Sequence, residues 1–440
     1  MKKSIVIILA ILLALSLAAC ANPQNGGDST DPQGSYSPAG NVSGSDGTSA
    51  DADTEPSENF THETPIRILV HSGASHDIWG NDSLSGTLSA AMTERDAAIG
   101  AMWSSAPEYT LSNINFQPQA MAGFDNYDIC LFRLSDAINY ASGGLALDVS
   151  GHIPHPENAA WEQGLWSLTF MGKTLFAAPS VSVNGNDRTY AVFYDAGADG
   201  GALKDKVESV DGWTWEQMLA MKTESPQLAN NGMYWGERTL SAMLIAGGFR
   251  LDPDSFDPAE MYMEPIIDYA ASGKVLIPSI LDGSPFKSSD RVFTVGQLDW
   301  LYDRENQTVY DRVTVLPMPR QSMEQTENRT ASFFISCMFV PSPAEGWQED
   351  CTDAMYVFAK ATYDKMRTPY LDQLVPASNA VSRANAEKLL ASRVYDYVLH
   401  SNDTWTTQNA KQVKSFIAKN RVEYLRASDK WADFYTQTTD

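Results

Sequence analysis

Residues 127–150 read YDICLFRLSDAINYASGGLALDVS, and this stretch decides the fold of the chain. Tyr127 to Phe132 is a short apolar run of the kind that forms a buried strand. Arg133, Ser135 and Asp136 follow it, and Asp136 to Gly143 has the composition of a helix. A strand followed directly by a helix is the unit of a parallel sheet. The stretch therefore predicts an α/β fold with polar side chains at a strand end.

The sequence on either side repeats this alternation. Ile66 to Val70 is predicted as a strand, residues 84–105 as a helix, and Leu111 to Phe116 as a second strand. About 380 residues exceed the usual size of a single core, so we expect two lobes. Further segments are predicted as helices (Trp215 to Thr223, Thr239 to Ala246, Asp350 to Lys365, 409–437) and strands (Arg312 to Leu316, Phe333 to Val340).

The N-terminus has the pattern of an export signal. Lys2 and Lys3 precede an apolar run, Ile5 to Leu17, which is shorter than the ~20 residues that span a membrane. The run ends in Leu-Ala-Ala-Cys, which resembles the lipobox of bacterial lipoproteins. Residues 1–19 are therefore predicted as a signal peptide, and Cys20 as the lipidated first residue of the mature chain.

The next segment, residues 20–61 including Cys20, is predicted to be a disordered linker. It is rich in Gly, Ser, Pro, Asn and Asp and holds seven acidic residues with no Lys or Arg. Such a composition cannot bury enough apolar area to offset the entropy of ordering the chain. We expect it to hold the rest of the protein clear of the membrane.

The net charge limits the class of partner. The chain carries a formal charge of −24, and removing Lys2, Lys3 and the seven linker acids leaves −19 on the remainder. Nucleic acid is excluded, because its binding is dominated by basic residues on phosphates. The balance favours a neutral or cationic solute over a strongly anionic one.

Cysteines and histidines give no sign of a metal or cofactor. Cys130 lies in an apolar run and is interpreted as a small buried residue, whereas a pairing of Cys337 with Cys351 stays open. His152 and His155 flank a proline and are interpreted as solvated loop residues. No spacing matches a zinc site, and no nucleophile or phosphate-loop motif is present. We predict no catalytic residue, no metal and no cofactor.

Five blocks in a fixed order carry a family resemblance, namely residues 127–150, 172–195 (GKTLFAAPSVSVNGNDRTYAVFYD), 213–219 (WTWEQML), 295–320 and 333–363. Together they resemble extracellular solute-binding proteins of ABC importers, most closely family 1, the maltose-binding-like sugar binders. Two positions depart from the family pattern. Asp195 stands where the family usually has Asn, and Leu298-Asp299 replaces a small residue and Met.

The resemblance implies a type II periplasmic-binding-protein-like fold with a ligand cleft between two α/β lobes. The N-terminal lobe is expected to hold residues 62–186 plus 312–367, and the C-terminal lobe residues 187–311 plus 368–440. It further implies a monomeric, non-enzymatic receptor for a mono- or oligosaccharide. This receptor would be anchored outside the cytoplasmic membrane and serve the membrane subunits of an ABC importer.

Candidate ligand residues of the first lobe follow predicted strands, because ligands bind beyond the carboxyl ends of strands in open α/β sheets. Trp79 lies in a polar loop and is predicted to face the cleft. Arg133, Ser135 and Asp136 are predicted to contact ligand hydroxyls, and helix capping by Ser135 or Asp136 is a compatible alternative.

The other candidates lie in the second lobe and at the crossing between lobes. Asp187 and Arg188 precede the crossing strand, and a solvated pair is the competing interpretation. Trp300 and Tyr302 suit a cleft and a core equally well, and Trp405 adds a further aromatic near the tail. The main predicted cluster is an aromatic pair beside two charges at a helix start: Tyr234, Trp235, Glu237 and Arg238.

Three other functions stay open on the sequence. A glycosidase needs only a pair of carboxylates, which 55 acidic residues always supply. A scaffold lipoprotein would have no closable cleft. A receptor for a peptide or a cationic solute would share the fold and differ in its ligand.

Overall fold

The computed structural model describes residues 64–80, 84–112, 126–169, 172–210, 212–236, 238–247, 264–276, 286, 291–301, 312–344, 346–375 and 378–395. All of them belong to one compact unit, residues 58–440. The signal peptide, Cys20, the linker, Glu237, Tyr302, Trp405 and the predicted tail helix lie outside the described residues.

The first sheet has four strands in the order β10-β3-β1-β2. Strands β1, β2 and β3 run parallel, and β10 runs antiparallel to β3. Residues 129–132 of β3 are fully buried, as a continuous apolar run in a covered parallel strand should be. The bounds are β1 Arg67–His71, β2 Glu108–Ser112, β3 Ile129–Arg133 and β10 Ser336–Phe339.

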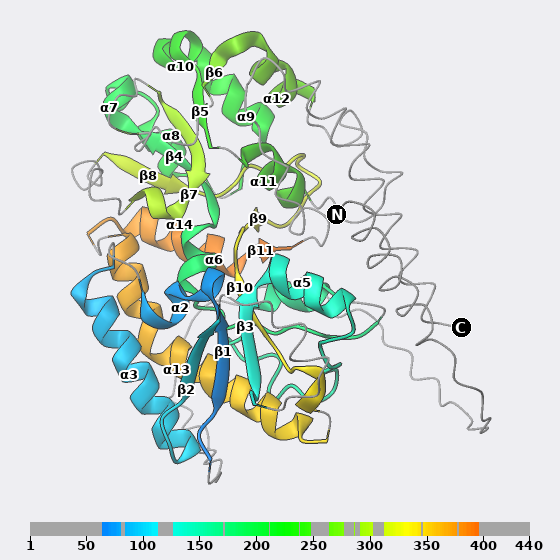
Figure 1. Cartoon of the computed structure of the whole chain (residues 1–440). Coiled ribbons are helices and arrows are strands. Elements are labelled where there is room, and N and C mark those ends of the chain that lie inside the picture. The colour runs from blue at the N-terminus through cyan, green and yellow to red at the C-terminus, as the bar shows by residue number, and fades with distance from the viewer. Residues whose placement is uncertain are drawn as a thin grey trace, which may run out of the picture. The chain divides into compact units, whose positions relative to one another are not determined.

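Helices cover this sheet, and the long pair α3 and α13 packs together (Figure 1). The side chain of Ser85 accepts a hydrogen bond from the Leu88 backbone N–H and so caps α3, as serine favours at this position. We call this sheet and its helices the first lobe. The bounds are η1 Ser72–Ala74, α2 His76–Trp79, α3 Gly86–Trp103, α5 Leu134–Ser142, η2 Gln163–Ser167, η7 Ser342–Ala344 and α13 Gln348–Leu374.

The second sheet has five strands in the order β6-β5-β7-β4-β8. Strands β5, β6 and β7 are parallel, and β4 runs antiparallel to both of its neighbours. All six residues of β4 are buried. The bounds are β4 Tyr190–Asp195, β5 Met233–Trp235, β6 Val275–Leu276, β7 Phe293–Gln297 and β8 Val313–Leu316.

The second lobe comprises this sheet and the helices around it (Figure 1). Thr214 and Gln217 form a capping box at the start of α9, which fixes the helix start predicted from WTWEQML. The bounds are α7 Ala196–Asp199, α8 Lys204–Glu208, α9 Trp215–Ala220, η3 Met221–Thr223, α10 Pro226–Asn231, α11 Thr239–Ala246, α12 Glu264–Tyr269, η5 Ala270–Lys274, η6 Leu298–Leu301 and α14 Ala380–Ala391.

Each lobe has its own hydrophobic core. The second-lobe core gathers around β4, β5 and β7, and the first-lobe cores lie on the two faces of the first sheet. A further cluster joins the lobes, because it contains Leu88 of α3, Phe193 of β4, Val315 of β8 and Tyr370 of α13. Within the described residues, the lobes therefore have separate cores that a shared cluster connects.

Three chain segments meet where the lobes join, and we call this region the crossover. It comprises α6 (Val183–Asp187) with residues 188–190, the segment 330–335 that begins with β9 (Thr330–Ala331), and β11 (Arg393–Val394). β9 pairs with β11, and Thr189 bridges to Ser332. The Thr330 hydroxyl also donates to the Tyr190 carbonyl oxygen at 2.6 Å.

The strand pairing corrects the predicted lobe boundaries. Residues 312–367 are predicted to lie in the first lobe, but β8 pairs with β4 in the second sheet. The chain returns to the first lobe through residues 330–335, which lead into β10 of the first sheet. The predicted break at residue 367 is also wrong, since α13 continues to Leu374. These boundaries depend on strand partners, which local periodicity does not reveal.

The three cysteines of the described residues are free and buried, so Cys337 and Cys351 do not pair. Burial raises the pKa of the Cys351 thiol to about 12, and it raises those of Cys130 and Cys337 further. No helix of the described ranges is both long enough and apolar enough to cross a bilayer.

Candidate functional site at the strand ends

The carboxyl ends of strands from both lobes meet at the crossover. β3 ends at Arg133, β5 at Trp235 and β7 at Gln297. The segment 330–335 passes between them, and the Leu134 backbone N–H donates to the Ile335 carbonyl oxygen at 2.8 Å. Loops that follow such strand ends are where open α/β sheets bind ligands. We call this region the strand-end site.

Phe334 is the residue that both lobes contact at this site. The guanidinium of Arg133 lies 5.0 Å from the Phe334 ring centroid, and that of Arg238 lies 4.7 Å from it. Phe334 has a φ of +67°, a left-handed conformation that costs a residue with a Cβ about 1–3 kcal/mol. The surrounding packing therefore holds this ring within reach of two arginines, one from each lobe.

Arg133 is fixed at its Nε atom. That atom donates to the Gly73 carbonyl oxygen at 2.7 Å, and a Cβ at Gly73 would lie only 2.7 Å from it. Gly73 is thus needed for the close approach of the guanidinium. Asn184 of α6 donates to the same carbonyl oxygen at 3.1 Å and also to Asp77, so the loop after β1 is tied to the crossover. Burial raises the pKa of the Asp77 carboxyl.

Trp300 forms the aromatic surface of the second lobe at this site. Its half-buried indole lies against the backbone of the strand ends, because a Cβ at Gly296 would be 1.8 Å from the ring and one at Gly236 would be 2.9 Å away. It meets Tyr234 edge to face, with ring centroids 5.9 Å apart. Glycine at 236 and 296 therefore lets the indole settle onto the sheet.

The two members of the predicted charged pair, Asp187 and Arg188, lie at different places. Arg188 is exposed and pairs with Asp299 at 3.1 Å, and it also bonds to Gln297 at the end of β7. Asp187 is buried and accepts a hydrogen bond from Tyr370 of α13 at 3.0 Å. Arg188 thus belongs to the rim of the strand-end site. Asp187 faces the joint between the lobes instead.

The remaining first-lobe candidates surround Arg133 or lie apart from it. Asp136 lies 3.4 Å from the Nδ1 atom of His71 at the end of β1. Neither Ser135 nor Asp136 caps α5, since the N-cap residue is Arg133. Trp79 is 51% exposed, and its ring contact within the described residues is with Tyr109 on the edge strand β2. Trp79 thus stands apart from the contacts that join Arg133 to the second lobe.

Trp235 is a correction to the prediction. Its side chain has no exposed area and belongs to the second-lobe core, so it cannot contact a solute. Along a strand, neighbouring side chains point to opposite faces, and Tyr234 is the member of the pair that meets Trp300. Of the predicted cluster, Tyr234 meets Trp300, and Arg238 contacts the same Phe334 ring as Arg133.

Residues that sequence reasoning missed complete the arrangement. Phe334, Asn184, His71, Gly236 and Gly296 hold or shape the named side chains. A glycine directly after β5 and another within β7 were signals for close approach. Phe334 carried no signal, because its role depends on an unusual backbone conformation.

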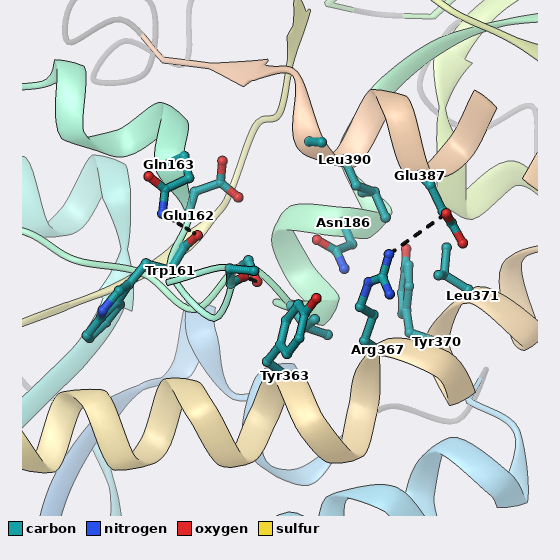
Figure 2. Close-up of a pocket in the computed structure, with 14 residues that line it drawn as sticks. Trp161, Glu162, Gln163, Asn186, Tyr363, Arg367, Tyr370, Leu371, Glu387 and Leu390 are labelled. Atoms are coloured by element: carbon teal, nitrogen blue, oxygen red, sulfur yellow. Dashed lines mark hydrogen bonds and ion pairs between the residues drawn. The ribbon is translucent and has the colours of Figure 1, made fainter. Parts of the chain in front are cut away.

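A separate cavity of about 290 Å³ lies beside the crossover, between α13, α14 and the loop around Trp161 (Figure 2). Its walls include Gln163, Asn186, Tyr363 and Arg367, and Arg367 pairs with Glu387 at 3.8 Å. None of the predicted ligand residues lines it. Because its walls are helix flanks and loops rather than strand ends, we place the candidate site at Arg133, Phe334, Arg238 and Trp300.

Two α/β lobes whose strand ends meet at a crossover define the type II periplasmic-binding-protein-like fold, and the predicted fold class is confirmed. No family model matches the chain, and no curated protein matches it.

Three solved structures share this fold at low sequence identity. A chitin oligosaccharide binding protein is 14% identical, with a TM-score of 0.51, over 83% of this chain and 98% of its own. The sugar-binding protein MalE of Xanthomonas citri is 12% identical, with a TM-score of 0.51, over 85% and 95%. The cyclic alpha-maltosyl-1,6-maltose binding protein of Arthrobacter globiformis is 13% identical, with a TM-score of 0.50, over 84% and 99%.

Proposed function

We propose that this protein is a lipid-tethered extracellular receptor that captures a carbohydrate between its lobes and delivers it to an ABC importer. The observation that carries the proposal is the shared contact at Phe334, which Arg133 reaches from the first lobe and Arg238 from the second. A solute bound there touches both lobes. Its differential affinity for the closed arrangement then drives hinge closure.

A sugar suits the chemistry of the strand-end site. The half-buried Trp300 indole supplies flat apolar surface for a pyranose face, and the buried Tyr234 ring packs edge to face against it. Arginine forks supply donors for the sugar oxygens. The similar folds named for chitin oligosaccharide, sugar and cyclic maltosyl-maltose binding support the same solute class. The receptor performs no bond chemistry and acts as a monomer. The loaded, closed form is the one that importer membrane subunits recognise.

A thermal-shift screen of mono- and oligosaccharides tests the proposal. A bound solute at 100 times its Kd should stabilise the chain by about 2.7 kcal/mol. The solute should be recovered unchanged after incubation, whereas a glycosidase would cleave it. A chain whose melting temperature no saccharide raises would contradict the receptor proposal.

Gly296→Ala should weaken binding of the best saccharide from this screen by roughly tenfold, or about 1.4 kcal/mol. The new methyl group would occupy the position of the Trp300 ring and push the indole off the strand. The same crowding should cost about 1–3 kcal/mol of stability. Isothermal titration calorimetry measures the affinity. Gly86→Ala is the matched control, because its methyl group meets open space, and unchanged affinity in Gly296→Ala would exclude Trp300 from the site.

Cys20→Ser should remove the lipid anchor. In the proposal, a lipid on Cys20 holds the chain at the outer face of the cytoplasmic membrane, and residues 21–61 act as a tether. Serine cannot form the thioether, so the chain should either keep its N-terminal segment or appear in the medium. Fractionation of cells and mass spectrometry of the N-terminus measure this. An unlipidated Cys20 in the wild-type chain would contradict the anchor.

A further inference from the structure

A buried carboxylate of the first lobe faces a buried amide of the crossover. Asp77 of α2 and Asn184 of α6 are 6% and 7% exposed. The Asn184 backbone N–H donates to one carboxylate oxygen at 3.2 Å, and its side-chain amide donates to the other at 3.1 Å. The guanidinium of Arg95, which is also buried, donates to the Asp77 main-chain carbonyl oxygen at 2.6 Å. Asp77 is therefore held at both its backbone and its side chain.

This pairing decides which way the Asn184 amide points. The amide nitrogen lies 3.1 Å from the Gly73 carbonyl oxygen and 3.1 Å from a carboxylate oxygen of Asp77. A carbonyl oxygen and a carboxylate only accept hydrogen bonds, so the nitrogen of the amide, and not its oxygen, must face both of them. Asp77 thus makes the crossover present a hydrogen-bond donor to Gly73.

The Gly73 carbonyl oxygen connects this pair to the strand-end site. It accepts a second hydrogen bond, from the Nε atom of Arg133 at 2.7 Å. This is the only hydrogen bond that the Arg133 side chain makes with a described residue. A Cβ at Gly73 would lie 2.7 Å from the same nitrogen, so the guanidinium rests directly on this backbone. The position of the Gly73 carbonyl therefore decides where the Arg133 guanidinium is presented.

We infer that Asp77 and Asn184 are positioning residues of the strand-end site, which hold the Gly73 carbonyl oxygen and, through it, the guanidinium of Arg133. This inference rests on the proposed function, because Arg133 is the first-lobe contact proposed for the saccharide. Both positioning residues are buried and act on the solute only through Gly73 and Arg133. Since Asn184 belongs to α6, the crossover sets the place of a solute contact in the first lobe.

Asp77→Asn tests the inference in the full-length chain purified in detergent. Asparagine keeps the shape of the side chain, but either orientation of its amide sets an NH₂ group against a donor of Asn184. Turning the Asn184 amide relieves that conflict and removes its bond to Gly73. We expect the affinity for maltose, maltotriose or diacetylchitobiose, whichever binds most tightly, to fall roughly tenfold in calorimetry. Asp128→Asn is the matched control, because Asp128 bonds to Arg67 at the amino ends of β1 and β3.

Nuclear magnetic resonance reports the position of Arg133 without a solute. The Nε–H signal of Arg133 can be identified by its loss in Arg133→Lys. In Asp77→Asn this signal should shift upfield and exchange faster with water, because its hydrogen bond to Gly73 is weakened. The signal should stay unchanged in Asp128→Asn.

The exchanged pair, Asp77→Asn with Asn184→Asp, separates positioning from stability. It restores a hydrogen-bonded amide and carboxylate between α2 and α6, but it places an acceptor against the Gly73 carbonyl oxygen. The melting temperature should therefore recover relative to Asp77→Asn, while the affinity should stay roughly tenfold weaker than in the wild-type chain.

Affinity that recovers together with the melting temperature in the exchanged pair would overturn the inference, and so would an unchanged Nε–H signal in a folded Asp77→Asn chain. If the exchanged pair does not fold, Asp77→Asn is measured in an Arg133→Gln chain, where its effect on affinity should fall below about twofold. A full tenfold effect there would show that Asp77 does not act through Arg133. Failure of all three sugars to bind would count against the carbohydrate receptor, and the Nε–H signal would still decide whether Asp77 positions Arg133.

Discussion

Arg393→Leu is expected to lower the free energy of unfolding by about 3–5 kcal/mol, because it breaks a buried ion pair and leaves one charge behind. Arg393 is only 2% exposed and donates to Glu162, Asn186 and the Ser180 carbonyl oxygen. These bonds tie β11 to loops of the first lobe at the crossover. Chemical denaturation monitored by circular dichroism measures the loss.

The loss should depend on pH in a defined direction. Burial raises the pKa of Glu162, and Arg393 opposes that rise. Without Arg393 the folded-state pKa rises further above the unfolded one, so the penalty is full at high pH and fades as the pH falls through the folded-state pKa. Arg383→Leu, which removes a surface pair, should cost no more than about 1 kcal/mol. If Arg393→Leu also lowered the free energy of unfolding by only about 1 kcal/mol, the Arg393–Glu162 pair would not stabilise the crossover.

Trp235→Ala should cost about 3–5 kcal/mol through the cavity it leaves in the second-lobe core. Trp235 has no exposed area and shares that core with Leu240 and Val295. Its indole N–H has no hydrogen-bond partner among the described residues, so Trp235→Phe should cost much less. The folded fraction of Trp235→Ala should keep its solute affinity.

Thermal unfolding together with calorimetry separates stability from binding in these variants. Trp347→Ala is a suitable control, because Trp347 is 37% exposed at the start of α13. A Trp235→Ala chain that keeps its melting temperature but loses solute binding would show that Trp235 contacts the solute. This result would contradict its place in the second-lobe core.

Much of the fold could be predicted because its elements are locally encoded. The apolar run before Arg133 and the helix after it are both present, and the predicted helix Thr239–Ala246 has the predicted bounds. The boundaries between lobes could not be predicted in the same way. β8 and β4 are far apart in the sequence, and a local hydrophobic pattern does not show which strands pair. Only the order of strands in the sheet assigns β8 to the second lobe.

The candidate site was partly predictable, because some of its residues follow locally encoded strands and helices. Position after a predicted strand indicated Arg133, whereas an aromatic pair beside charges at a helix start indicated Arg238. For Trp300, cleft and core were equally possible. Tyr234 and Trp235 are predicted together as ligand residues, because both are aromatic and the sequence does not say which side of β5 faces the core. Phe334 could not be predicted, because its position depends on an unusual backbone φ of +67°.

The charge argument shows a limit of composition. A formal charge of −24 favoured a neutral or cationic solute, since it describes the average surface. The strand-end site nevertheless brings two arginines, Arg133 and Arg238, onto one ring. The local arrangement of charged side chains decides which solute a site binds. At the strand-end site, the crossover sets that arrangement.

Small-angle X-ray scattering with and without a saturating saccharide tests the central claim most directly. The account predicts that the radius of gyration falls when solute binds, because the lobes close around it. It also predicts that Arg133→Gln weakens this response at the same solute concentration. Binding confirmed by calorimetry with no change in the radius of gyration would contradict a hinged receptor.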